Sequence, residues 1–296
     1  MTATPAPDTD PDPAILDRAR AVIAAALDEV GPQLLGPPSE LTIEAKSDGT
    51  PVSNADIEVD DHLRSAIVAA FDSHGVLSEE RGTRSPLTAW TWVIDPIDGT
   101  SNFINGLPYW CISVALLHHG EPVLGVIDAP VLGRRYTALI GRGAEREDRC
   151  HDGTVGPARR LAVRDPVPWR DPSNGHVPVL LATGAARRAR DAGLALNPRV
   201  MGSTALDLAL VAEGVAAASI ARIPKVWDVA AGALLVREAG GAVVTLDDVP
   251  LLPLAVDQEQ AGRSALTAAG PDAAYVEELT RALLTARPRK AGRGRR

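Results

Sequence analysis

Apolar residues recur at helical spacing near the start of the chain. Between residues 15 and 30 they fall three or four positions apart, and glycine and proline end this pattern within residues 31–38. A second helical pattern occupies residues 59–71. It follows Ser53 and Asn54, and either residue can cap a helix. Two helices are therefore predicted, and Asp56 is expected in the first turn of the second.

Shorter apolar runs then predict an antiparallel sheet. Residues 89–94, 111–117 and 122–129 have the composition of strands, and a hairpin turn at 118–121 joins the last two. A further short apolar strand is expected just before Glu79. The segment 141–171 is rich in Arg, Gly, Asp and Pro, and it is predicted to be a long connection between two lobes.

Helices and strands alternate in the second half of the chain. Strands are expected at 178–183, near 199–201, near 215–220, at 242–246 and at 264–270. Helices are expected near 184–192, from Ser203, from Asp228 and at 272–286. This alternation indicates an α/β layer. The predicted fold class is therefore layered α/β, with an N-terminal α+β lobe at 13–150, a C-terminal α/β lobe at 151–286, and terminal tails at 1–12 and 287–296.

The composition limits the binding partners and the cellular compartment that can be expected for this protein. The 38 acidic and 30 basic residues give a net charge of −8, which argues against nucleic acid or an anionic membrane as the main partner. The two cysteines, Cys111 and Cys150, cannot form a disulfide framework. No apolar run has the length needed to span a bilayer. A cytoplasmic protein is expected.

The most informative short segment is Asp95-Pro96-Ile97-Asp98-Gly99-Thr100. Two aspartates follow an apolar run, and Pro96 is expected to turn the backbone so that both side chains face one pocket. Gly99 and Thr100 could open a helical turn whose free N–H groups favour an anion. Carboxylates beside an anion repel it unless a cation lies between them, and such oxygen ligands suit Mg²⁺. On this segment alone, an ordinary capped turn remains an alternative.

Two further acidic positions strengthen the metal hypothesis. Glu79 and Glu80 come directly after a short apolar segment, and Asp228 begins a predicted helix behind Trp227. A buried acid at such a helix start would be unfavourable without a cation. The six histidines show no ligand-like spacing. Carboxylates, rather than histidines, are the expected ligands.

With these motifs in place, the sequence resembles the inositol monophosphatase family of Mg²⁺-dependent phosphomonoesterases. The matching segments are KSDGTPVSNAD, SEE, WVIDPIDGTSNF, GSTALDLALVAEG and WDVAAGALLVREAGG, in the order of the family and over roughly residues 40–245. The resemblance implies an α-β-α-β-α sandwich, a homodimer, sensitivity to Li⁺, and two or three Mg²⁺ ions per site. It also implies hydrolysis of a small phosphorylated metabolite by metal-activated water.

The resemblance assigns roles to individual residues. Glu79, Asp95 and the carbonyl group of Ile97 would hold a first metal, and Asp95, Asp98 and Asp228 a second. Asp56 would bind a further metal or orient the attacking water, and Thr100 would hydrogen-bond that water. The phosphate and substrate side would be formed by the following residues: Asp98, Gly99, Thr100, Gly202, Ser203, Thr204 and Arg222.

Substrate choice is where the chain departs from the family pattern. Many members carry an acid seven positions before the aspartate of the WD motif, where it binds substrate hydroxyls, but this chain has Ala221 there, followed by Arg222. An inositol phosphate or related sugar phosphate is expected, with histidinol phosphate or a 3′-phosphonucleotide as alternatives. A non-catalytic relative that binds metal or phosphate is the alternative from another class.

Three residues near the motifs need separate comment, and two of them keep two interpretations each. Lys46 is either a loop lysine or the group that neutralises the acidic cluster in the absence of metal. Glu80 is either a partner of the metal-binding residues or an exposed side chain. Trp227 is expected to be a packed aromatic that holds Asp228 in place.

Overall fold

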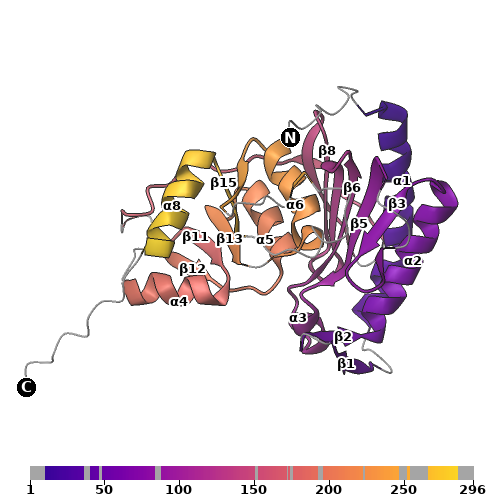
Figure 1. Cartoon of the computed structure of the whole chain (residues 1–296), viewed down its shortest axis with the longest axis horizontal. Coiled ribbons are helices and arrows are strands. Elements are labelled where there is room, and N and C mark those ends of the chain that lie inside the picture. Colours follow the sequence, from indigo (N-terminus) through magenta and orange to yellow (C-terminus); the bar gives the residue numbers. More distant parts are fainter. Residues whose placement is uncertain are drawn as a thin grey trace, which may run out of the picture.

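The first half of the chain forms a helical layer and a large sheet. The computed structural model describes residues 11–36, 41–46, 49–83, 88–150, 153–171, 173, 176–192, 196–222, 224–246, 252–253 and 266–285. Helices α1 (Pro13–Val30) and α2 (Asn54–Ala70) pack together on the outer face of the sheet (Figure 1). Asp12 caps α1, and Ser53 caps α2 as one of the two caps predicted for the second helix. The 3₁₀ helix η1 (Gly31–Leu35) follows α1.

Within the described residues the first sheet has eight strands in the order β10-β9-β8-β7-β6-β5-β3-β4. Its pairs are antiparallel except for β3 with β5. The bounds are β3 Gly75–Ser78, β4 Gly82–Thr83, β5 Trp90–Asp98, β6 Cys111–His118, β7 Glu121–Ala129, β8 Arg134–Leu139, β9 Gly143–Asp148 and β10 Arg159–Arg160. A small hairpin of β1 (Ile43–Ala45) and β2 (Pro51–Ser53), the helix α3 (Thr100–Ile104) and the 3₁₀ helix η2 (Pro130–Leu132) complete this half.

Two expectations for this sheet were wrong. The segment 141–171 is not wholly a connection, because it contributes β9 and β10, and the first sheet therefore continues past residue 150. Strand β5 does not end before Asp95 but runs to Asp98. Its register against β6 shifts between Asp95 and Asp98. Pro96 cannot donate a ladder hydrogen bond, and a bulge of this kind accommodates it.

The second half forms a five-stranded sheet with helices on both faces. Its strand order is β12-β11-β13-β15-β14 in the described part of the chain. The bounds are β11 Pro178–Leu181, β12 Asn197–Arg199, β13 Ala218–Arg222, β14 Ala242–Thr245 and β15 Leu266–Gly270. Helices α5 (Thr204–Ala212) and α6 (Val226–Glu238) cover one face, and α4 (Thr183–Ala192) and α8 (Ala273–Thr285) cover the other. The predicted α/β alternation is confirmed.

The layers stack in the order helix, sheet, helix, sheet, helix (Figure 1). Helices α5 and α6 lie between the two sheets, and one buried core joins residues of the first sheet, such as Val93 and Ile127, to Leu208 and Leu235 of these helices. The layered sandwich expected from the sequence is confirmed. No helix of the described residues is both long and apolar enough to cross a bilayer. Apart from residues 11 and 12, the predicted tails lie outside the described residues.

Candidate active site

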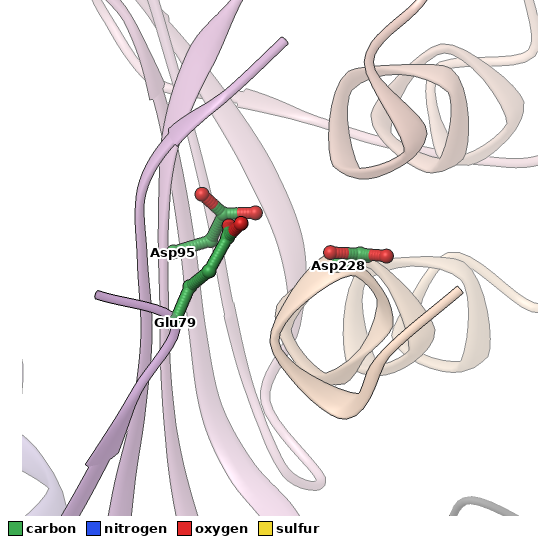
Figure 2. Close-up of side chains that lie close together, drawn as sticks. All are labelled: Glu79, Asp95 and Asp228. Atoms are coloured by element: carbon green, nitrogen blue, oxygen red, sulfur yellow. The ribbon is translucent and has the colours of Figure 1, made fainter. Parts of the chain in front are cut away.

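Three carboxylates from different elements converge between the first sheet and α6. Glu79 follows β3, Asp95 lies on β5, and Asp228 lies in the first turn of α6 (Figure 2). One oxygen from each side chain lies within 4.8 Å of the others. Figure 2 shows Glu79 and Asp95 on the sheet side, facing Asp228 across the gap. The sequence named all three residues, which lie up to 149 positions apart, and the fold brings them together.

The environment of these carboxylates fits a cation. Asp95 is 1% exposed, and its Oδ1 atom has no hydrogen-bond partner. Burial, followed by the charges of Glu79, Asp98 and Asp228, raises the pKa of Asp95 well above its usual range. Burial and the charge of Asp98 raise the pKa of Asp228 in the same way. Buried like charges with an orphaned oxygen are stabilised by a hard divalent ion, so the residues present fit Mg²⁺.

Asp98 lies beside this cluster but makes different contacts. Its Oδ2 accepts hydrogen bonds from Ser203 Oγ and from the main-chain N–H of Ala205, both at 2.6 Å. Burial raises the pKa of Asp98 to about 6, although these hydrogen bonds act in the opposite direction. Asp98 is not among the carboxylates that converge within 4.8 Å. Its sharing of a metal with Asp95 and Asp228 stays a prediction.

Asp56, Thr100 and Ile97 form a second group at the bulge. Asp56 Oδ2 accepts hydrogen bonds from Ser53 N at 2.8 Å and Ser53 Oγ at 2.5 Å, which fixes the carboxylate at the start of α2. The Thr100 hydroxyl lies 3.3 Å from Asp56 Oδ1 and 3.0 Å from the carbonyl oxygen of Ile97. Burial raises the pKa of Asp56, and its hydrogen bonds with Ser53 partly offset this. The three predicted residues therefore do meet.

Lys46 contacts two acids of the candidate site directly. Its Nζ donates to Glu79 Oε1 at 2.6 Å and to Glu80 Oε1 at 2.5 Å. Burial alone would lower the pKa of Lys46, but the hydrogen bonds and charges of Glu79 and Glu80 outweigh it and raise that pKa. The side chain of Glu80 is 5% exposed. Of the interpretations left open, Lys46 is the neutralising group, and Glu80 is a buried partner.

A buried network that the sequence did not reveal holds the turn carrying Glu79. Ser78 Oγ donates to Asp60 Oδ2 at 2.6 Å and accepts from Arg64 Nη2 at 2.7 Å. The main-chain N–H of Arg81 also donates to Asp60 Oδ2, at 3.1 Å. Asp60 lies one helical turn after Asp56 on α2, so one helix supports both regions of the site. The i, i+4 spacing of Asp56 and Asp60 is the signal that could have found it.

The substrate side is built where the two lobes meet. Gly99 and Gly202 have positive φ values of 100° and 91°, and a Cβ atom at Gly99 would lie 3.3 Å from the carbonyl oxygen of Gly202. Asn102 Nδ2 donates to the carbonyl oxygens of Tyr109 at 2.7 Å and Met201 at 2.8 Å. Asn102 was missed because its partner Met201 is 99 positions away.

The remaining predicted residues surround a separate depression. Ser203 caps α5, Thr204 is its first residue, and Ala221 and Arg222 end β13. These four residues line one cavity of about 220 Å³ with Gly202. Arg222 is exposed at the end of β13, where its main chain pairs with Leu266 of β15. Trp227 is partly buried against the central core, as expected of a packed aromatic.

With this geometry established, similarity to known proteins identifies the family. The model of the inositol monophosphatase family matches residues 16–280. The chain belongs to the inositol monophosphatase family. Family membership makes it a phosphomonoesterase, as the motifs predicted.

Individual relatives agree with this membership. The chain is 39% identical over 217 residues to a histidinol-phosphatase of Mycobacterium tuberculosis. The aligned region covers 71% of this chain and 80% of the relative. It is 34% identical over 289 residues to a probable inositol 1-monophosphatase of the same organism, over 93% of each chain. The solved structure of the extragenic suppressor protein suhB from Bartonella henselae has a TM-score of 0.72 at 26% identity, over 91% of this chain and 99% of that one.

Proposed function

We propose that this family member hydrolyses a small phosphate monoester with Mg²⁺ bound at Glu79, Asp95 and Asp228. The observation that carries the proposal is the convergence of these three carboxylates within 4.8 Å, with Asp95 Oδ1 buried and unpartnered. A bound divalent ion would neutralise the carboxylates, withdraw electron density from the phosphate and make water a better nucleophile.

The proposed metal ligands follow the family resemblance. Glu79, Asp95 and the carbonyl group of Ile97 would hold one ion, Asp95, Asp98 and Asp228 a second, and Asp56 a third. Ser203 Oγ and Ala205 N both donate to Asp98 Oδ2, so the orientation of the Asp98 carboxylate is fixed. Asp98 would thereby link the metals to the substrate side.

The proposed attack on phosphorus depends on Thr100 and Asp56. The Thr100 hydroxyl lies 3.3 Å from Asp56 Oδ1, so both groups could hydrogen-bond one water molecule, and the Asp56 carboxylate could accept its proton. The main-chain N–H groups of Gly99 and Thr100 at the start of α3 are proposed to donate to the phosphate oxygens. Gly202, Ser203, Thr204 and Arg222 are proposed to contact the alcohol part of the substrate.

The proposed substrate is an inositol phosphate or a related sugar phosphate. Histidinol phosphate is the second candidate, because a histidinol-phosphatase is 39% identical to this chain. A homodimer in the cytoplasm, acting on a small metabolite rather than on nucleic acid, is part of the same proposal. The metals are proposed to lie between the two lobes.

Phosphate release from a panel of esters tests this proposal. The panel contains myo-inositol 1-phosphate, histidinol phosphate, fructose 1,6-bisphosphate and 3′-phosphoadenosine 5′-phosphate, each with Mg²⁺ and with EDTA. One ester should be hydrolysed far faster than the others, and only with Mg²⁺. Asp95→Asn should lower kcat by about a hundredfold or more, because metal stabilisation of transition-state charge contributes several kcal/mol.

The matched control is Asp165→Asn, which removes one exposed carboxylate from the connection between the lobes. This variant should retain the wild-type rate. Hydrolysis that persists in EDTA, or an Asp95→Asn variant with wild-type activity, would contradict the proposed function.

A further inference from the structure

The cavity next to the proposed metal site is lined in part by a buried acid, Asp207. It measures about 220 Å³ and is lined by small residues such as Ala182, Gly202 and Ala221, together with Thr183, Ser203, Asp207 and Arg222. Ser203 connects the two sites, because it lines the cavity while its Oγ donates to Asp98. A molecule whose phosphate lay at the metals could therefore extend its alcohol part into this cavity.

Asp207 is the buried charge of this cavity. It lies in the first turn of α5, it is 9% exposed, and its Oδ1 accepts a hydrogen bond from the Tyr109 hydroxyl at 2.7 Å. No described residue donates a hydrogen bond to its other oxygen, Oδ2. A buried carboxylate normally accepts several hydrogen bonds, so Asp207 has capacity for a further donor.

The surroundings favour a donor from the ligand. The position where many family members carry an acid is Ala221, which offers no side-chain acceptor. Asp207 and Arg222 are the charged residues among those that line the cavity, and Arg222 is exposed at the end of β13. Asp207 is thus the carboxylate available to recognise a polar group inside the cavity.

We propose that Asp207 is a specificity-determining residue, whose Oδ2 accepts a hydrogen bond from a hydroxyl or amino group on the alcohol part of the substrate. The inference rests on the proposed phosphatase function and narrows its substrate class. The class is phosphate esters of polyols or amino alcohols. Simple aryl phosphates lack the donor and gain nothing from this contact.

Tyr109 has a supporting role in this arrangement. Its hydroxyl occupies Oδ1 and orients the carboxylate, and its carbonyl oxygen is held by Asn102 Nδ2 at 2.7 Å. The loop after α3 therefore positions Asp207, although Asp207 belongs to the second half of the chain. Tyr109 is therefore a positioning residue, whereas Asp207 is the residue proposed to contact the substrate.

Steady-state kinetics of Asp207→Asn with Mg²⁺ test the proposal. Asparagine keeps the size and can still accept from Tyr109, but it replaces the second oxygen with a donor. The ratio of kcat/KM for the polyol or amino-alcohol ester to kcat/KM for p-nitrophenyl phosphate should fall about 10- to 100-fold, mainly through KM, because a lost hydrogen bond to a charged group has effects of this size. Myo-inositol 1-phosphate and histidinol phosphate are the two esters used.

A second variant keeps the test decisive if Asp207→Asn does not fold. Tyr109→Phe removes only the bond that orients Asp207, and it should lower the same ratio several-fold. An unchanged ratio in either folded variant would overturn the specificity role, while the proposed phosphatase function would stand. Failure of the wild-type protein to hydrolyse any of the three esters would instead overturn the phosphatase proposal, and this inference with it.

Discussion

Lys46 holds Glu79 and Glu80 together through one ammonium group. Replacing it with methionine keeps the length of the side chain but leaves two neighbouring carboxylates without a cation. We expect Lys46→Met to lower Tm in EDTA, because the two acids then repel each other. The same change should tighten Mg²⁺ binding several-fold, since Mg²⁺ no longer competes with the ammonium for Glu79. Thermal denaturation and calorimetric Mg²⁺ titration measure the two effects.

Arg187→Met is the control for Lys46→Met, because Arg187 is an exposed cation on α4. It should change neither Tm in EDTA nor the affinity for Mg²⁺. If Lys46→Met bound Mg²⁺ no more tightly than the wild type, the ammonium would not compete with the metal for Glu79.

Asp207 makes the stability of the protein dependent on pH. Burial, and secondarily the charge of Asp98, raises the pKa of Asp207 to about 7 in the folded protein, although the Tyr109 hydrogen bond opposes this shift. The usual pKa of an unfolded Asp is about 3.9. The folded protein therefore binds this proton more tightly, and the resulting stabilisation is lost as the pH rises through about 7. Tm should fall between pH 5 and pH 8.

The measurement is thermal denaturation with saturating Mg²⁺, which keeps the metal-site carboxylates ionised over this range. Asp207→Asn removes the titrating group and should flatten the fall in Tm. A wild-type Tm that rises over the same interval, or an equally steep fall in Asp207→Asn, would assign the pH dependence to other groups.

At the scale of elements, the position of α6 depends on the absence of a side chain at Gly125. A Cβ atom at this residue of β7 would lie 2.7 Å from the carbonyl oxygen of Ala231 and 3.0 Å from its Cα. Gly125→Ala should lower the free energy of unfolding by about 1–3 kcal/mol, the usual cost of overpacking. It should also weaken Mg²⁺ binding, because Asp228 moves with α6. Urea denaturation and Mg²⁺ titration give both values.

Gly36→Ala is the control, because nothing lies within 4 Å of a Cβ atom at Gly36 and its φ of −78° suits alanine. This variant should match or slightly exceed the wild-type stability. A Gly125→Ala variant that unfolded at the wild-type urea concentration would show that α6 can move away from the sheet without cost.

Strands β8 and β9 show why the whole of the first sheet could not be predicted from the sequence. The charged composition of β9 is typical of a connection, but the pairing places its Asp148 and Glu147 opposite Arg134 and Arg135 of β8. Opposite charges on facing strands stabilise a sheet, and only the pairing reveals this. The helices α1, α2 and α5 were predictable because their caps and apolar spacing are local. Strand β5 was extended past its predicted end by a bulge, which depends on the partner strand.

At the scale of the whole molecule, contacts between the two halves complete the site. Ser203 donates to Asp98, Asn102 to the carbonyl of Met201, and Tyr109 to Asp207. The motifs predicted that Glu79, Asp95 and Asp228 lie at one site, because each motif is recognisable from its own local sequence. They could not predict Asn102, Tyr109 or the Asp60 network, whose partners are fixed by the packing of distant segments.

The central position of α6 has a consequence for how the chain is made. The inner face of the first sheet is covered by α5 and α6, although both helices come after all the strands of that sheet in the sequence. While the ribosome is still synthesising the second half, this apolar face has no cover. The N-terminal half therefore needs protection from aggregation until residue 238 has emerged. A fragment that ends before α5 should be insoluble, because the apolar face that α5 and α6 cover in the whole protein would be exposed to water.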